Sequence, residues 1–204
     1  MNNVIEKYDV SRETIKDLET FQKMVLEWND RFNLISKSSE SDIWQRHIID
    51  SLQLKQFISA EDKILYDFGS GAGFPGIVLA IASKKYFPEL QISLIESIGK
   101  KVIFLNEVKN NLNLNINILQ DRIEKLKLPK ADIITSRALA SLDKLLVYAY
   151  SFCKKNTKLV FPKGEKWQEE VTVAQKNWNF SLEVFPSQTS ETGKILYIKN
   201  IRRK

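Results

Sequence analysis

A glycine-rich segment that follows an apolar run is the strongest constraint on how this chain folds. The segment is Asp67–Gly76, DFGSGAGFPG, and the apolar run before it is Ile64–Tyr66. Glycine tolerates the positive φ angles of tight turns and lets a ligand lie against bare backbone. A strand that ends in such a loop, with a helix beyond it, places backbone N–H groups at the carboxyl edge of a sheet. Nucleotide-like ligands bind at that edge in doubly wound α/β folds.

Strand-like runs alternate with helical patterns over the middle of the chain. The predicted strands are Lys63–Phe68, Gln91–Glu96, Asn115–Gln120, Asp132–Ser136 and Lys158–Phe161. Between them, apolar residues recur at helical spacing from Ile98 to Leu112 and from Leu142 to Phe152. This alternation predicts a parallel sheet whose strands are joined by right-handed crossovers.

The C-terminal part of the chain breaks this alternation. Ser181–Phe185 and Ile195–Lys199 have the pattern of strands, and only the polar stretch Ser187–Gly193 lies between them. A connection this short allows only an antiparallel pair. We therefore expect the sheet to end in a reversed strand.

A helical extension precedes the first predicted strand. Between Ile15 and Ile35, apolar residues recur every three or four positions, as on one face of a helix, and Ser11 is the candidate N-cap. A second helix is expected from Ser41 to about Ile58. We predict an N-terminal extension over residues 1–60 and an α/β core over residues 61–204, forming one structural domain.

The charge and cysteine content restrict the possible partners. The formal net charge of +6 suits a polyanion such as nucleic acid, although many basic proteins bind none. The single cysteine, Cys153, excludes an internal disulfide and a multi-cysteine zinc site, so no metal is expected. We expect Cys153 to be an inert core residue at the end of a helix.

No secretory or membrane-spanning segment is recognisable in the sequence. The first residues, MNNVIEKYDVSRE, are polar and charged, unlike a signal peptide. The longest apolar run, Ile77–Ala82, is far shorter than the roughly 20 residues that a membrane helix requires. A cytoplasmic location without membrane contact is the resulting expectation.

The glycine segment leaves the choice of nucleotide open. Gly71–Gly76 matches G-x-G-x-x-G, but bulky Phe74 and Pro75 stand where the pyrophosphate of NAD would approach the helix. Phe74 is better suited to covering an adenine or a thioether edge. Glu96 ends the second predicted strand and could accept hydrogen bonds from both ribose hydroxyls of an adenosine, in NAD and S-adenosylmethionine alike. The alternative for Glu96 is a solvent-facing strand end.

Further motifs make the chain similar to a known family. They are RHIIDS (Arg46–Ser51), IESIGKKVIFL (Ile95–Leu105), RIE (Arg122–Glu124), SRALASL (Ser136–Leu142) and PKGE (Pro162–Glu165). With DFGSGAGFPG, they occur in the order found in the bacterial ribosomal RNA small subunit methyltransferase G family, also called glucose-inhibited division protein B. The resemblance extends from about Trp28 to the final strand.

The resemblance implies a class I S-adenosylmethionine-dependent methyltransferase fold, which is Rossmann-like, with a seven-stranded sheet and a reversed last strand. It implies methylation of N7 of one guanine in the decoding-region loop of 16S ribosomal RNA, with that RNA or the small ribosomal subunit as partner, and a monomer. The family's cofactor positions fall on Gly69, Phe74, Ile123, Glu124 and Arg137. General fold logic adds Gly71 and Glu96 to this set.

The implied chemistry requires alignment more than proton transfer. Guanine N7 has an exposed lone pair and no hydrogen, so in-line displacement needs no general base. Arg137, after the fourth predicted strand, could contact the cofactor or guanine O6, or form a strand-end salt bridge instead. Lys163, after the fifth, could contact an RNA phosphate or be a plain surface lysine. The same two alternatives apply to Lys100 and Lys101.

Two other hypotheses compete with the methyltransferase. Tyr150 and Lys154 form Y-x-x-x-K, which short-chain dehydrogenases use, and this spacing would place both on one helix face. An NAD(P)-dependent oxidoreductase is therefore the alternative enzyme. A non-catalytic ribosome assembly factor that retains the glycine loop is the third hypothesis. His47, the only histidine, is expected to organise a lid over the cofactor cleft rather than act in catalysis.

Overall fold

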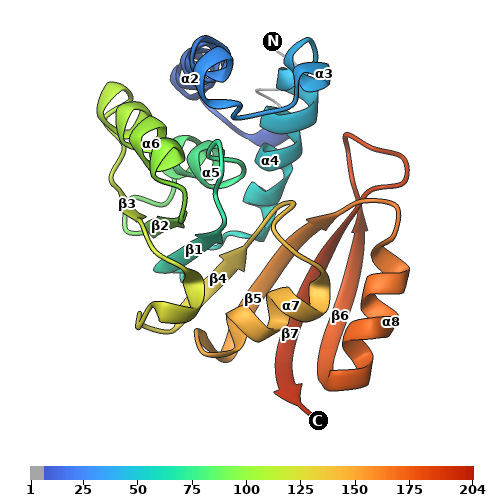
Figure 1. Ribbon diagram of the computed structural model, residues 1–204. Coiled ribbons are helices and arrows are strands. Elements are labelled where there is room, and N and C mark those ends of the chain that lie inside the picture. The colour runs from blue at the N-terminus through green and yellow to red at the C-terminus, as the bar shows by residue number, and fades with distance from the viewer. Residues whose placement is uncertain (1–6) are drawn as a thin grey trace.

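A seven-stranded sheet forms the centre of the molecule, as Figure 1 shows. The computed structural model describes residues 7–204. In spatial order the strands are β3-β2-β1-β4-β5-β7-β6. Their bounds are β1 Ile64–Phe68, β2 Gln91–Ile95, β3 Ile116–Leu119, β4 Ala131–Thr135, β5 Cys153–Lys163, β6 Trp178–Pro186 and β7 Lys194–Arg203. The strand order reverses between β1 and β4, and ligands bind at such switch points in open α/β sheets.

The strand directions confirm the predicted sheet. β1 pairs in parallel with β2 and β4, and the parallel set continues outward to β3 and β5. β7 lies antiparallel between β5 and β6, which confirms the reversed last strand. Because parallel strands end at the same edge, the residues that follow β1, β2 and β4 are brought to one place.

Helices cover both faces of the sheet (Figure 1). The α5 helix (Gly76–Ser83) and the α6 helix (Gly99–Asn111) pack on one face, under the N-terminal α2 helix (Arg12–Phe32). The α7 helix (Leu142–Tyr150) and the α8 helix (Trp167–Asn177) pack together on the other. Among residues 7–204, no helix is both long and apolar enough to cross a bilayer.

The N-terminal helices agree with the prediction only in part. Ser11 is the N-cap of α2, and its hydroxyl accepts a hydrogen bond from the Thr14 N–H. The expected second helix, Ser41 to about Ile58, is present as one uninterrupted helical run, made of a π-helical turn Trp44–Ile49, α4 (Asp50–Leu52) and a 3-10 turn Gln53–Phe57 in place of a regular α-helix; the short α3 (Lys37–Glu40) precedes it. Within this run, Asp50 and Gln53 form hydrogen bonds with segments that are distant in the sequence.

Apolar side chains join the N-terminal helices to the sheet. The Phe21 ring of α2 lies 5.1 Å from the Phe74 ring of the glycine loop, and Trp28 lies 5.7 Å from Phe104 of α6. Burying aromatic pairs of this kind stabilises a contact by about 0.5–1.5 kcal/mol beyond the area they cover. One continuous apolar cluster therefore contains side chains from the α2 helix, the glycine loop and the α6 helix.

Two sequence expectations around Cys153 are wrong. The α7 helix ends at Tyr150, and Cys153 begins β5 instead of ending a helix. The polar run Lys154–Thr157 obscured the first part of this strand, whose predicted start was Lys158. Burial raises the pKa of the Cys153 thiol to about 12, so the thiol stays protonated and unreactive. The α8 helix is an element that the sequence analysis did not anticipate.

The Y-x-x-x-K pair does not share a helix face. Tyr150 is the last residue of α7, whereas Lys154 lies in β5 and forms an ion pair with Asp132 near the start of β4. This pair is therefore at the amino edge of the sheet, opposite the glycine loop. The two side chains are not arranged as a dehydrogenase requires.

Candidate functional site

A cleft of about 490 Å³ opens at the carboxyl edge of the sheet, beside the glycine loop. Its walls come from the segments that follow β1, β2, β3 and β4. Seven of the residues proposed from the sequence line it, namely Gly69, Gly71, Phe74, Glu96, Ile123, Glu124 and Arg137. Four separate segments thus bring the predicted cofactor residues into one cavity.

Glycines in the loop serve two different purposes. Gly69, Gly71 and Gly73 have φ angles of +67°, +58° and +92°, which other residues rarely adopt. A Cβ on Gly69 would lie 2.6 Å from Leu139, and one on Gly73 would lie 2.5 Å from Ile77, so these two positions are also closely packed. A Cβ on Gly71 would meet nothing closer than 3.8 Å. Gly71 therefore has bare backbone in the cleft lining, with room for small groups between it and Lys101.

Glu96 fixes the backbone around this open position. One of its carboxylate oxygens accepts a hydrogen bond from the Gly71 N–H at 2.9 Å, and the other accepts from the Ile98 N–H at 2.8 Å. The side chain is buried in the cleft wall, so the solvent-facing alternative is wrong. Each carboxylate oxygen retains a second lone pair, and Glu96 can accept further hydrogen bonds from a ligand.

Asp67, near the end of β1, holds the far end of the glycine loop. It is fully buried, and its Oδ2 accepts a hydrogen bond from the Gly76 N–H at 3.0 Å, where α5 begins. Burial raises the pKa of this carboxyl to about 7. The sequence analysis did not single out Asp67, although its place at the end of an apolar strand was a usable signal.

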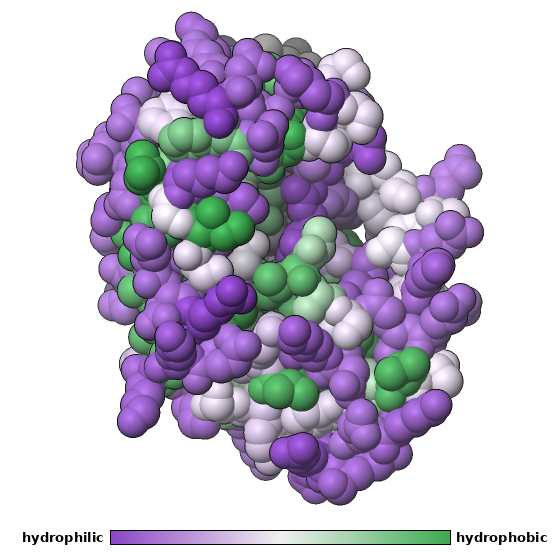
Figure 2. Space-filling model, in the orientation of Figure 1, coloured by the Kyte–Doolittle hydropathy of each residue, from purple (hydrophilic) through white to green (hydrophobic). Residues whose placement is uncertain are grey.

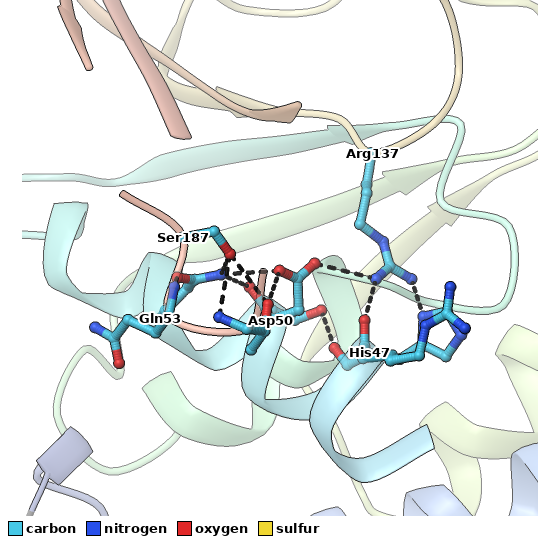
Figure 3. A network of polar contacts seen from close by, with 9 residues as sticks. His47, Asp50, Gln53, Arg137 and Ser187 are labelled. Carbon is cyan, nitrogen blue, oxygen red and sulfur yellow. Dashed lines mark hydrogen bonds and ion pairs between the residues drawn. The ribbon is translucent and has the colours of Figure 1, made fainter. Parts of the chain in front are cut away.

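Arg137 connects the cleft to the π-helical turn of the N-terminal segment, as Figure 3 shows. Its guanidinium donates to the Asp50 carboxylate at 3.2 Å and to the Arg46 carbonyl at 3.1 Å. It also lies 2.7 Å from His47 Nδ1, and its Cζ is 5.2 Å from the Phe74 ring centroid. The salt bridge that was one alternative for Arg137 therefore exists, but its partner comes from the N-terminal segment.

His47 lies between Arg137 and the glycine loop. Its ring stacks on Phe74 at 5.0 Å between centroids, and it lines the cleft. Burial, together with the charges of Arg137 and Arg46, lowers the pKa of His47 to about 4. The ring is therefore neutral at pH 7. Since Nδ1 faces a guanidinium, Nδ1 is the acceptor and the proton is on Nε2.

The free energy of unfolding should fall as the pH is lowered from about 6.5 to about 4. In this range His47 binds a proton in the unfolded protein but stays neutral in the folded one. The upper limit is the ordinary pKa of histidine, about 6.5, and the lower limit is the pKa of His47 in the folded protein, about 4. Because the ring is only partly buried, we expect a loss on the order of 1 kcal/mol. Urea unfolding of the wild type and of His47→Gln at pH 7 and pH 4.5 measures it. An equal pH dependence in both proteins would contradict the assignment.

Lys163 lines a second cavity, beside the cleft, and Arg137 lines both. Its ammonium donates to the Ala140 carbonyl at 2.8 Å and to Glu170 at 2.7 Å, and its side chain is only 9% exposed. Lys163 is thus held in an ion pair, and its role as an RNA contact stays a prediction. Lys101 lines the first cleft near Gly71, whereas Lys100 is exposed beside it.

Asp50 and Gln53 are the functional residues that sequence reasoning missed. Asp50 Oδ1 accepts hydrogen bonds from Gln53 at 2.9 Å and from the Thr189 hydroxyl at 2.7 Å. Gln53 Oε1 accepts from the Gln188 N–H at 2.9 Å. The i, i+3 spacing of His47 and Asp50 in RHIIDS places both on one helix face and was a usable signal, but nothing in the sequence indicated the partners near residue 189.

Comparisons with known proteins place the chain among RNA-modifying enzymes. The family model described as rRNA small subunit methyltransferase G matches residues 14–196. A Cereibacter sphaeroides protein named ribosomal RNA small subunit methyltransferase G is 40% identical over 197 residues, covering 97% of this chain and 96% of the relative. A Gluconobacter oxydans protein of the same name is 41% identical over 194 residues, covering 95% and 97%.

Solved structures of other methyltransferases share the fold. A SAM-dependent methyltransferase from Aquifex aeolicus has a TM-score of 0.62 at 18% identity, covering 80% of this chain and 96% of that one. An O-methyltransferase from Bacillus cereus, solved in complex with SAH, has a TM-score of 0.59 at 13% identity, covering 89% and 91%. At these identities the likeness concerns the fold alone.

Proposed function

Because the chain belongs to the rRNA small subunit methyltransferase G family, we propose that it transfers a methyl group to N7 of a guanine in the decoding-region loop of 16S ribosomal RNA. The observation that carries this proposal is the convergence of the predicted cofactor residues on a single cleft at the switch point of the sheet. The methyl donor is S-adenosylmethionine.

The residues of the cleft fit S-adenosylmethionine. Gly71 carries no side chain and lines the cleft, so a ligand there can approach the backbone closely. We propose that Glu96 accepts hydrogen bonds from the ribose hydroxyls with its remaining lone pairs. Phe74 and Ile123 provide apolar surface for the adenine, and Glu124, at the mouth, provides an acceptor.

Arg137 is the proposed residue on the methyl side of the cleft. It lines both cavities, and its contacts with Asp50, Arg46 and His47 fix the guanidinium in one orientation. Five N–H groups are available on a guanidinium and three are used here, so two remain for a ligand. We propose that one of them contacts guanine O6 or the cofactor.

The bound cofactor supplies an electrophilic methyl group. Guanine N7 carries a lone pair and no hydrogen, so the protein has no proton to remove before the bond forms. The chain's residues therefore need only to orient the reactants, exclude water and tolerate the movement of positive charge. Neutral His47 adds no positive charge beside Arg137, where positive charge moves during the transfer. Buried Asp67 holds the glycine loop that orients the cofactor.

We further propose that the protein works as a cytoplasmic monomer on the RNA or on the small ribosomal subunit. Residues 1–60 and 61–204 would form one unit, as the shared apolar cluster supports. The formal charge of +6 favours association with RNA.

Methyl transfer into small ribosomal subunits is the direct test. Subunits from cells that lack this gene should accept tritium from labelled S-adenosylmethionine, and the label should be recovered as 7-methylguanine at one position. RNA binding without any incorporation would favour the assembly-factor hypothesis instead.

Calorimetry separates the methyltransferase from the oxidoreductase. We expect S-adenosylmethionine to bind and NAD to show no measurable heat, because bulky Phe74 and Pro75 stand where the pyrophosphate of NAD would approach the helix. Preferential binding of NAD would reverse this assignment.

A further inference from the structure

The two cavities at the carboxyl edge of the sheet share one wall. That wall is Arg137–Leu139, the segment directly after β4, and it lines both the cofactor cleft and the second cavity. Ala138 has a φ angle of +57°, which is uncommon for a residue with a side chain. Unusual backbone conformations of this kind concentrate at functional sites. The two cavities therefore adjoin at this segment.

The second cavity has the size and lining of a base-binding pocket. Its volume is about 740 Å³, and apolar atoms of Leu139, Pro162, Val173 and Ile195 contribute to its walls. In the space-filling view, the surface is hollowed between the helices at the top and the hairpin at the right, with apolar atoms beside the hollow (Figure 2). Apolar walls with a few placed polar groups are typical of small-molecule sites.

Glu170 is the polar group best placed to select a base in this cavity. Its Oε2 accepts hydrogen bonds from Lys163 Nζ at 2.7 Å and from the Leu142 N–H at 2.6 Å. No hydrogen bond to its Oε1 is present among residues 7–204. Because Lys163 is itself held by the Ala140 carbonyl, the carboxylate is fixed with one oxygen available.

The hairpin between β6 and β7 forms the opposite wall and is held in place. Thr189 donates to Asp50, and the Gln188 N–H donates to Gln53. Both acceptors belong to the N-terminal segment that also binds Arg137. The cavity is therefore preformed, which lowers the entropic cost of binding. Cationic side chains of Arg46, Lys166 and Lys194 also belong to its lining and suit the phosphates on either side of a base.

We propose that the second cavity receives the target guanine and that Glu170 Oε1 accepts a hydrogen bond from its 2-amino group. This inference rests on the proposed function and adds the specificity-determining residue. Guanine presents hydrogen-bond donors at N1 and N2, whereas adenine presents an acceptor at N1 and no group at C2. The 2-amino group and N7 lie at opposite ends of a purine, so a base held at Glu170 leaves N7 free to face the shared wall.

Inosine tests this assignment, because it differs from guanosine only by lacking the 2-amino group. Methyl transfer is measured on RNA substrates with guanosine or inosine at the target nucleotide. The wild type should favour guanosine at least tenfold in kcat/KM, since the carboxylate oxygen is left unpaired with inosine. In Glu170→Gln this preference should fall to about threefold or less, with unchanged affinity for S-adenosylmethionine. Glu165→Gln, an exposed neighbour outside both cavities, should keep the wild-type preference.

Two results would overturn the proposal. One is a wild type that methylates both substrates equally well, a result that does not depend on how any variant folds. The other is a folded Glu170→Gln protein, verified by thermal melting, that retains the full preference for guanosine. If the wild type methylated neither RNA nor small subunits, the proposed function itself would fail, which is a different outcome.

Discussion

Gly71→Val should weaken S-adenosylmethionine binding by at least about a hundredfold, or about 2.7 kcal/mol. Valine is β-branched and would have to adopt a φ angle of +58°. Its side chain would also enter the open part of the cleft, between the loop and Lys101. The hydrogen bond from the Gly71 N–H to Glu96 would be disturbed as well. Isothermal titration calorimetry measures the loss directly.

Gly99→Ala is the matched control for this substitution. Gly99 begins the nearby α6 helix, has an ordinary φ angle and lies outside the cleft lining, so its affinity for the cofactor should be unchanged. Wild-type affinity in Gly71→Val would mean that the loop serves a purpose other than ligand binding. Thermal melting of both variants separates a binding defect from a folding defect.

Arg137→Ala should reduce both turnover and stability. The guanidinium is the charged partner of Asp50, whose side chain is only 16% exposed, so its removal leaves a largely buried carboxylate with neutral partners alone. Loss of a charge-assisted hydrogen bond of this kind costs about 1.5–3 kcal/mol. We expect kcat/KM for methyl transfer to fall at least about a hundredfold, a loss of transition-state stabilisation of about 2.7 kcal/mol.

Arg137→Lys distinguishes the shape of the group from its charge. A lysine keeps the positive charge near Asp50. Its single ammonium lacks the planar guanidinium geometry that lets Arg137 bind the Asp50 carboxylate, the Arg46 carbonyl and His47 Nδ1 at once. We expect most of the stability to return and most of the activity to stay lost. Arg31→Ala, an exposed cation in the last turn of α2, is the control and should leave both unchanged. Full activity in Arg137→Ala would show that the residue is structural only.

Local sequence patterns predicted most of the fold. The pattern of apolar residues located all seven strands, because burial on one or both faces leaves a regular trace in the sequence. The short connection between the last two strands predicted the reversed direction of the final one. Ser11 was recognisable as an N-cap because its hydroxyl bonds to the backbone only three residues away. The start of β5 was missed because Lys154–Thr157 lacks apolar residues; Cys153 pairs with Ala131 of β4, and the register shifts before pairing resumes at Lys158.

The site was predictable in its composition but not in its connections. Residues at strand ends were identified from motifs, and they line one cleft because parallel strands share an edge. The partners of Arg137 and Lys163 were not predictable, because they depend on which segments meet after folding. Asp50 and Thr189 lie far apart in the sequence yet share a hydrogen bond, and no local pattern encodes such a pair.

The place of β7 in the sheet imposes an order on assembly during synthesis. β6 leaves the ribosome first, but it reaches the sheet only through β7, which inserts between β5 and β6. Until β7 emerges, the edge of β5 stays unpaired and the hairpin that binds Asp50 and Gln53 has not closed. A nascent chain halted inside β7 would therefore lack the hairpin wall of the second cavity.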